Sequence, residues 1–211
     1  MLQYQTLPAT PTLRTAAVMS RFGIDFETAP VVIAREFELS LPAPAVVAFT
    51  GESGSGKSTL MRHVAATLPD GVDLDAVELG TQPLIDRLGG SVDEAMRLLS
   101  RCGLAEPRLL LRRPGELSEG QRYRFRLAVA VDSLPNGSGW IMADEFTATL
   151  DRTLARVVAR NVGRLAAARG IGVLLATTHR DVIADLSPEV HVRCRLDDEP
   201  DVIDRRGNGE R

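Results

Sequence analysis

Continuous apolar runs alternate along this chain with segments whose apolar residues recur at helical spacing. Runs of this length and composition are typical of strands that are buried on both faces of a parallel sheet. We expect such strands over residues 45–49, 140–143 and 172–177, and helices over residues 57–68, 121–134 and 154–169. Strands that alternate with helices in this order predict an α/β fold with a parallel-sheet core and right-handed crossovers.

The segments outside this alternation define the expected domain organisation. Residues 1–30 are interrupted by three prolines and are expected to be irregular, and short strands at residues 31–33 and 37–41 predict an N-terminal β region. A helical pattern over residues 91–111, broken near Gly103 and Pro107, indicates a small helical subdomain. The expected divisions are an N-terminal segment (1–30), a main domain (31–196) that contains the reduced helical subdomain (83–116), and a charged, flexible tail (197–211).

Composition narrows the class of protein without identifying it. A chain of 211 residues suits one α/β domain, and a net charge of −3 gives no basic footprint of general nucleic-acid binding. Cys102 and Cys194 form no CxxC pair, and with three histidines they give no zinc spacing, so we expect two reduced thiols. No apolar run approaches the roughly 18 residues that a membrane-spanning helix needs, so we expect a soluble, cytoplasmic protein without direct membrane insertion.

A glycine-rich loop lies between the strand expected at 45–49 and the helix expected from Lys57. It fits the pattern G-x-x-x-x-G-K-[ST], in which backbone N–H groups and a helix N-terminus surround the phosphates of a nucleotide. We expect Lys57 to neutralise the β- and γ-phosphate oxygens of ATP and Ser58 to hold Mg²⁺. The expected ATP-binding residues are Gly51, Glu52, Ser53, Gly54, Ser55, Gly56, Lys57, Ser58 and Thr59.

Two carboxylates, Asp144 and Glu145, directly follow the apolar run at 140–143. A carboxylate at the tip of a strand beside a phosphate-binding loop is placed to bind Mg²⁺, which is the role expected for Asp144. Glu145 is the candidate general base that polarises the water attacking the γ-phosphate. The sequence therefore predicts a site for Mg²⁺-dependent ATP hydrolysis.

The pentapeptide Leu117-Ser118-Glu119-Gly120-Gln121 follows the glycine loop in the chain and precedes the two carboxylates. In that order these motifs resemble the ATP-binding cassette (ABC) family, whose members share a P-loop NTPase fold. The resemblance covers about residues 31–195. It implies that the pentapeptide, the family's signature motif, faces the γ-phosphate held by a second subunit in a head-to-tail dimer. Glu119 stands where the family more usually has glycine, and Phe146 where it usually has proline.

The same resemblance assigns several single residues. His179, at the end of the strand expected at 172–177, is similar to the switch histidine, and Asp151 to the D-loop aspartate. Gln82 is similar to the Q-loop glutamine, which contacts the Mg²⁺ ion and water. The resemblance also implies an aromatic residue that stacks on adenine, for which Phe22 and Phe26 are both candidates.

Two functions remain open at this stage. One is a soluble ABC-type ATPase, acting as a homodimer on a partner enzyme or on nucleic acid, and similar to compact ATPases that are sometimes joined to an acetyltransferase-like domain. The other is the nucleotide-binding subunit of a transporter whose permease is a separate chain. The short stretch between Gln82 and Ser118, together with Glu119 and Phe146, leads us to expect the soluble role.

Overall fold

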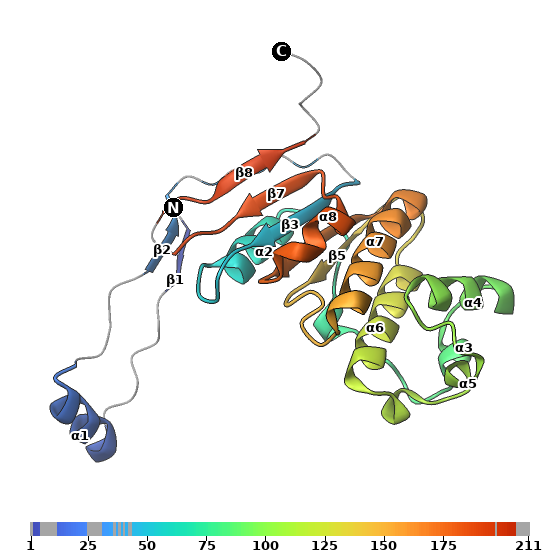
Figure 1. The fold of residues 1–211 in the computed structure, drawn as a ribbon, viewed down its shortest axis with the longest axis horizontal. Coiled ribbons are helices and arrows are strands. Elements are labelled where there is room, and N and C mark those ends of the chain that lie inside the picture. Colours follow the sequence, from blue (N-terminus) through green and yellow to red (C-terminus); the bar gives the residue numbers. More distant parts are fainter. Residues whose placement is uncertain are drawn as a thin grey trace, which may run out of the picture.

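The computed structural model describes residues 2–4, 12–24, 31–35, 37, 39, 41, 44–196 and 198–205. Within them a twisted sheet carries helices on both faces, and a two-stranded sheet lies near the N-terminus (Figure 1). The strands are β1 (Leu2–Tyr4), β2 (Val31–Ala34), β3 (Val46–Thr50), β4 (Gly71–Asp73), β5 (Trp140–Ala143), β6 (Gly172–Thr177), β7 (Val190–Arg193) and β8 (Asp201–Asp204). The α-helices are α1 (Leu13–Phe22), α2 (Lys57–Ala65), α3 (Leu84–Arg87), α4 (Val92–Arg101), α5 (Pro107–Leu110), α6 (Glu119–Ser133), α7 (Arg152–Arg169) and α8 (Ile183–Leu186). The 3₁₀ helices are η1 (Leu74–Ala76), η2 (Pro114–Glu116) and η3 (Arg180–Val182).

The main sheet has the strand order β4-β5-β6-β3-β7-β8, and its neighbours are parallel up to β7. The expected α/β class with a parallel-sheet core is therefore confirmed. Strands β5 and β6 have the expected bounds, and β3 begins and ends one residue later than expected. Because these strands are parallel, the carboxyl ends of β3, β5 and β6 meet at one edge of the sheet, where the chemistry of such folds is usually found.

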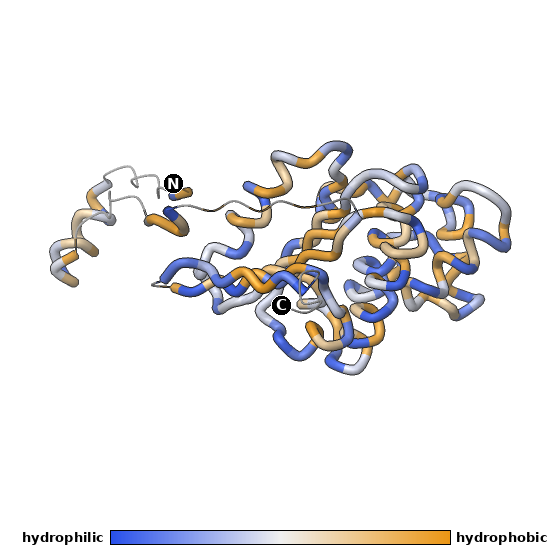
Figure 2. Tube along the Cα trace, turned by 90° about the horizontal axis from the view of Figure 1, so that it is seen from above, coloured by the Kyte–Doolittle hydropathy of each residue, from blue (hydrophilic) through white to orange (hydrophobic). Residues whose placement is uncertain are grey.

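Alternate residues of each central strand pack into two separate cores. Along β3, Val46 and Ala48 face the core that α6 and α7 cover, whereas Val47 and Phe49 face the core that α2 covers. All five residues of β3 are buried, which explains why its sequence is continuously apolar rather than alternating. Figure 2 shows the resulting concentration of hydrophobic residues along the central strands.

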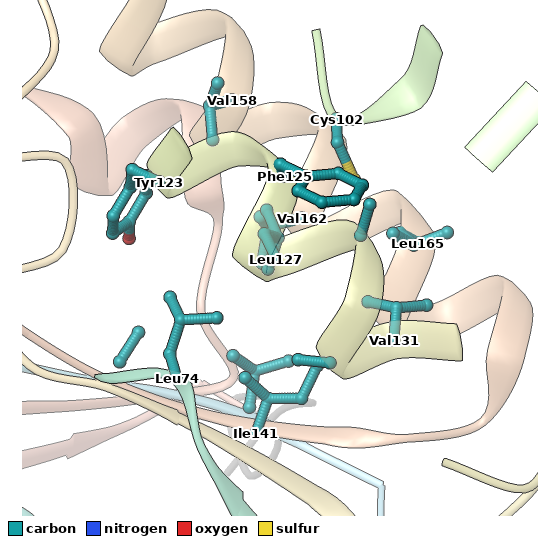
Figure 3. Close-up of a cluster of buried hydrophobic side chains, with 14 of the residues drawn as sticks. Leu74, Cys102, Tyr123, Phe125, Leu127, Val131, Ile141, Val158, Val162 and Leu165 are labelled. Carbon is teal, nitrogen blue, oxygen red and sulfur yellow. The ribbon is translucent and has the colours of Figure 1, made fainter. Parts of the chain in front are cut away.

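The core beneath α6 and α7 is built around a fully buried Phe125 (Figure 3). Its neighbours come from helices on one side of the sheet and from the sheet itself, so this cluster attaches the helical layer to the strands. The labelled residues come from η1 (Leu74), the end of α4 (Cys102), α6 (Tyr123, Phe125, Leu127, Val131), β5 (Ile141) and α7 (Val158, Val162, Leu165).

Replacing Phe125 by alanine is expected to lower the free energy of unfolding by about 3–5 kcal/mol, because it removes a buried ring and leaves a cavity. Urea unfolding followed by circular dichroism measures the change. Val157, an exposed apolar residue on α7, gives the control, since Val157→Ala is expected to change stability by less than about 0.5 kcal/mol. Equal effects of the two substitutions would contradict the assignment of Phe125 to the core.

The N-terminal segment, expected to be irregular, contains two regular elements. β1 pairs with β2 in antiparallel fashion, and α1 lies between them in the chain. Helix α1 begins at a capping box between Thr12 and Thr15 and ends at Gly23, which has a left-handed conformation. The expectation was wrong because the prolines lie outside the ten residues of α1, and these caps stabilise the two ends of the helix.

The tail expected to be flexible also contains a strand. β8 lies antiparallel to β7 and extends the main sheet, with Arg193 opposite Asp201 and Val192 opposite Val202. Arg195 forms ion pairs with Asp198 and Asp201 across the connecting segment. The high charge of this segment does not prevent a strand, because an edge strand that is half exposed tolerates charged residues. The strand expected at residues 37–41 lies partly outside the described residues.

Helices α3, α4 and α5 fall within the stretch assigned to the helical subdomain. The helical pattern over 91–111 forms two helices, α4 and α5, and is broken near Gly103 and Pro107 as expected, because Gly103 has a left-handed φ of 84° and Pro107 begins a new helix. Helix α4 begins at a capping box between Ser91 and Glu94. Together these short helices form a layer beside α6, away from the edge strands β7 and β8 (Figure 1).

Candidate active site

The glycine loop connects β3 to α2 and has the backbone that phosphate binding requires. Gly54 and Gly56 both have a φ of 82°, a conformation that favours glycine, and Gly56 is the N-cap residue of α2. A Cβ atom at Gly51 would overlap the Cys194 carbonyl oxygen, so the first glycine is needed for packing against β7. The loop therefore presents backbone N–H groups and the N-terminus of α2 to one small volume.

Lys57 lies over this loop. Its Nζ atom donates a hydrogen bond to the Glu52 carbonyl oxygen at 2.6 Å. This places the ammonium group beside the space that the loop encloses, where the β- and γ-phosphates of a nucleotide would lie.

Ser58 and Asp144 are brought together from two different elements. The Ser58 Oγ atom, on the first turn of α2, donates to Asp144 Oδ1 at 2.8 Å, at the carboxyl end of β5. The Glu145 backbone N–H donates to the same oxygen at 3.0 Å. The two groups that the sequence assigned to Mg²⁺ are thus direct neighbours.

Glu145 occupies a tight turn after β5 and has a left-handed φ of 47°. The following residue is clamped to β6, because Phe146 N–H donates to the Ala176 carbonyl at 2.8 Å and Thr177 Oγ1 donates to the Phe146 carbonyl at 3.1 Å. Phe146 itself is fully buried. A non-glycine residue with positive φ is a strained conformation, found most often at functional sites, and here it leaves the Glu145 side chain exposed beside the glycine loop.

His179 follows β6 at the same edge of the sheet. Its backbone N–H donates to Thr177 Oγ1 at 3.1 Å, and its buried Nδ1 atom has no hydrogen-bond partner among the described residues. Partial burial, and to a lesser extent the nearby Arg152 guanidinium, lower the pKa of His179 below its usual value. The imidazole is therefore neutral at pH 7, so one ring nitrogen can donate a hydrogen bond and the other can accept one.

A cavity of about 270 Å³ lies at this edge of the sheet, and His179 is not among the residues that line it. Asp144, Glu145 and Ala148 line it from the segment after β5, and the remaining lining comes from the glycine loop, the start of α2 and the end of β6. The lining residues are Ser53, Gly54, Lys57, Ser58, Asp144, Glu145, Ala148, Ala176, Thr177 and Thr178. We call this the phosphate cavity.

The signature residues lie apart from the lining of the phosphate cavity. Ser118 is the N-cap of α6, where its Oγ accepts from Gln121 N–H at 3.3 Å and Gln121 Oε1 accepts from Ser118 N–H at 3.0 Å. Gly120 packs against the loop before α7: a Cβ atom there would lie 3.1 Å from Leu150 Cδ2 and 3.3 Å from the Thr149 carbonyl oxygen. Within one chain, Ser118 and Gly120 therefore do not line the cavity at the N-terminus of α2.

Other predicted residues are not brought to the phosphate cavity. Gln82 is exposed, and its Oε1 atom accepts from Thr81 N–H at 3.1 Å. Asp151 is the N-cap of α7, and its Oδ1 atom accepts from Leu154 N–H at 3.0 Å. Phe22 is an exposed residue of α1, and Phe26 lies outside the described residues, so the adenine contact stays a prediction.

The donor set fits magnesium. Mg²⁺ takes oxygen ligands, usually one or two from the protein with the rest from water and phosphates, and the Ser58 hydroxyl and the Asp144 carboxylate supply such a pair. Among the described residues no group of three or more His, Cys, Asp and Glu could hold a metal ion by itself.

Burial raises the pKa of Cys102 to about 12 and that of Cys194 to about 11, so both thiols are protonated at neutral pH.

The sequence motifs did not indicate one residue of this site, Arg62. Arg62 Nη2 lies 3.2 Å from Asp144 Oδ2 and forms an ion pair with it. Its position in the sequence could have indicated it, since Ser58 and Arg62 are four residues apart and so lie on the same face of α2.

A phosphate-binding loop between a buried strand and a helix, with a strand-end carboxylate against its serine, defines a P-loop NTPase.

Comparisons with known proteins narrow this class. No protein-family model matches the chain. It is 30% identical to the "Phosphonates import ATP-binding protein PhnC" of Hyphomonas neptunium, with 77% of each chain covered. It is 34% identical to the "Macrolide export ATP-binding/permease protein MacB" of Bordetella avium, where the similarity covers 77% of this chain and 29% of the longer protein. The fold is similar to that of MJ0796, a dimeric bacterial ABC transporter cassette, with a TM-score of 0.60, 19% identity, and 85% and 93% of the two chains covered.

The chain belongs to the ABC family of ATP-binding cassettes, and it is an ATPase. The resemblance that the sequence motifs indicated is thereby confirmed. Among the residues that the structure describes, none of the helices combines the length and apolar character that crossing a membrane requires.

Proposed function

We propose that the chain is the nucleotide-binding subunit of an ABC transporter and that its permease is a separate chain. PhnC and MacB are named for import and export, and the match to PhnC extends over most of both chains. These relatives favour the transporter role over the soluble role that we expected from the short subdomain. That expectation rested on the small surface that the short subdomain offers to a permease.

The observation that carries this proposal is an apolar groove on the helical subdomain. It has a volume of about 520 Å³, and three of its apolar side chains, Val92, Met96 and Leu111, are strongly exposed. Exposed apolar side chains gathered around a groove are typical of a surface that a partner covers. The groove is lined by Ile85, Asp86, Leu88, Gly90, Ser91, Val92, Ala95, Met96, Pro107, Leu110 and Leu111.

The occupant proposed for this groove is a short amphipathic helix on the cytoplasmic side of the permease. Binding of an amphipathic helix in an apolar groove buries one face of the helix and leaves its polar face in water. Because the groove and the signature helix α6 both contact α4, a movement of the occupant would be passed to the ATP site through packed helices.

The proposed hydrolytic mechanism assigns tasks to four residues that line the phosphate cavity and to His179, which follows the lining residue Thr178 in the chain. Lys57 exchanges its bond with the Glu52 carbonyl for the β- and γ-phosphate oxygens. Glu145 accepts the proton of the attacking water, and neutral His179 donates a hydrogen bond to the γ-phosphate as charge develops there. Bound magnesium neutralises the charge of the phosphates, and Ser58 and Asp144 are the residues that would hold it.

The proposed active state is a head-to-tail homodimer with two ATP molecules at its interface. Ser118 and Gly120 are not among the residues that line the phosphate cavity of their own chain, which supports this arrangement. In the dimer, the α6 N-terminus of one subunit would face the γ-phosphate held by the other. Helix N-termini are suited to bind anions.

A photo-crosslinking residue placed at position 96 tests the transporter role in cells of the source organism. We expect it to capture one polytopic membrane protein, identified by mass spectrometry, because Met96 lines the groove. The same residue at position 157 is the matched control, since Val157 is an exposed apolar residue on α7, outside the groove. Capture of a soluble enzyme or of nucleic acid from position 96, or no capture at all, would contradict the proposal.

A further inference from the structure

Both oxygens of the Asp144 carboxylate already have partners in the structure. Oδ1 accepts from Ser58 Oγ and from the Glu145 backbone N–H, and Oδ2 is paired with the Arg62 guanidinium at 3.2 Å. The Asp144 side chain is 13% exposed, whereas that of Arg62 is 69% exposed. Of these partners Arg62 is therefore the one that can leave without disturbing buried structure.

Arg62 and a divalent cation would compete for the same carboxylate. Arginine keeps its positive charge at any accessible pH, so it cannot release Asp144 by losing a proton. Two cations held at one carboxylate repel each other, and an exposed ion pair is weak, with a stability of about 0–1 kcal/mol. Movement of the Arg62 side chain away from Asp144 ends this competition at a small cost in free energy.

The structure offers a place for the released guanidinium. A second cavity, of about 450 Å³, also has Asp144 and Glu145 in its lining, and Arg62 lines it together with two further carboxylates, Asp75 and Glu119. Two other guanidinium groups, those of Arg122 and Arg126, line the same cavity, so the two carboxylates are shared among three arginines. Asp75 follows β4, the strand beside β5, and Glu119 begins α6. Glu119 belongs to the signature motif, so this cavity connects the proposed metal site to the proposed dimer surface.

We infer that Arg62 is the resting counter-ion of Asp144, that it leaves Oδ2 when Mg²⁺ and nucleotide bind, and that it moves toward Asp75 and Glu119. The inference rests on the proposed Mg²⁺ site of Ser58 and Asp144. In this arrangement Arg62 influences the Mg²⁺ concentration at which Mg²⁺ and nucleotide bind to the cassette. It is a positioning residue and takes no part in bond making.

Titration with Mg²⁺ in the presence of a fluorescent ADP analogue tests this role without a measurement of hydrolysis. Arg62→Met should lower the half-saturating Mg²⁺ concentration by about threefold, because an exposed ion pair no longer competes for Asp144. Arg97→Met on α4 removes the same charge from an exposed site away from this cavity and should leave the midpoint unchanged. Arg62→Lys, which keeps the charge, should restore most of the wild-type midpoint.

Two kinds of failure can be told apart. Mg²⁺-dependent binding with equal midpoints in the wild type and in Arg62→Met overturns the role of Arg62 and leaves the metal site intact. Nucleotide binding that is independent of Mg²⁺ in the wild type overturns the metal site, and this inference with it. Arg62→Gln, which keeps most of the side chain but not the charge, serves as a second neutral variant and should give the same shift as Arg62→Met.

Discussion

Glu145→Gln is expected to lower ATP turnover by about 10²–10⁴-fold and to leave ATP binding intact. The substitution removes the proton acceptor but preserves the size of the side chain, so the turn held by Phe146 and Thr177 should remain. Because hydrolysis is blocked after binding, the ATP-bound dimer should accumulate. Release of phosphate measures turnover, and light scattering after size exclusion measures the dimer.

Glu106→Gln provides the control for this substitution. Glu106 is exposed at the start of α5 and is not among the residues lining the phosphate cavity, so turnover should stay at the wild-type level. An unchanged hydrolysis rate in Glu145→Gln would contradict the assignment of Glu145 as the base. Loss of ATP binding in that variant would instead indicate that Glu145 serves the structure of the loop.

Ser118→Arg is expected to reduce turnover by about 10²–10³-fold, as for the loss of one donor to the transition state, although each chain still binds ATP. Ser118 does not line the phosphate cavity of its own chain, and in the proposed dimer its replacement removes the hydroxyl that would face the γ-phosphate held by the second subunit. Fluorescence of an ATP analogue measures binding to the single chain, and release of phosphate measures turnover.

Ser118 also caps α6, so its loss is expected to cost about 1 kcal/mol of stability by itself. Ser91 separates the two effects, because it caps α4 through the same kind of capping box. Ser91→Arg should lower stability by a similar amount and leave turnover unchanged. Equal losses of turnover in the two variants would contradict a role for Ser118 beyond the cap.

The parallel sheet was predictable because continuous apolar runs have few alternatives in a chain of this length. β5 and β6 have the bounds expected from such runs, and the glycine loop follows β3 as its motif requires. Edge and terminal elements were not predictable in this way. β8 has as many charged as apolar residues, and all residues of α1 are exposed or half-buried. Neither segment therefore shows a pattern of apolar positions that predicts a buried element.

Motif spacing also has a limit at the candidate site. It indicated Ser58 and Asp144 separately, and the structure places them 2.8 Å apart. It did not indicate Arg62, whose contact with Asp144 depends on the direction of α2 relative to β5. The family resemblance assigned Gln82, which stays a prediction, and neither the resemblance nor the spacing indicated Asp75, which follows β4 and lines the cavity next to Asp144.

Mixing two inactive variants tests the central claim, that each ATP site is completed by a second copy of the chain. Lys57→Ala disables the phosphate loop and Ser118→Arg disables the signature, so a mixed pair keeps one complete site. If chains associate at random, half of the pairs are mixed and one of their two sites works, which predicts about a quarter of wild-type turnover. Turnover no greater than the sum of the two variants measured separately would contradict a shared site.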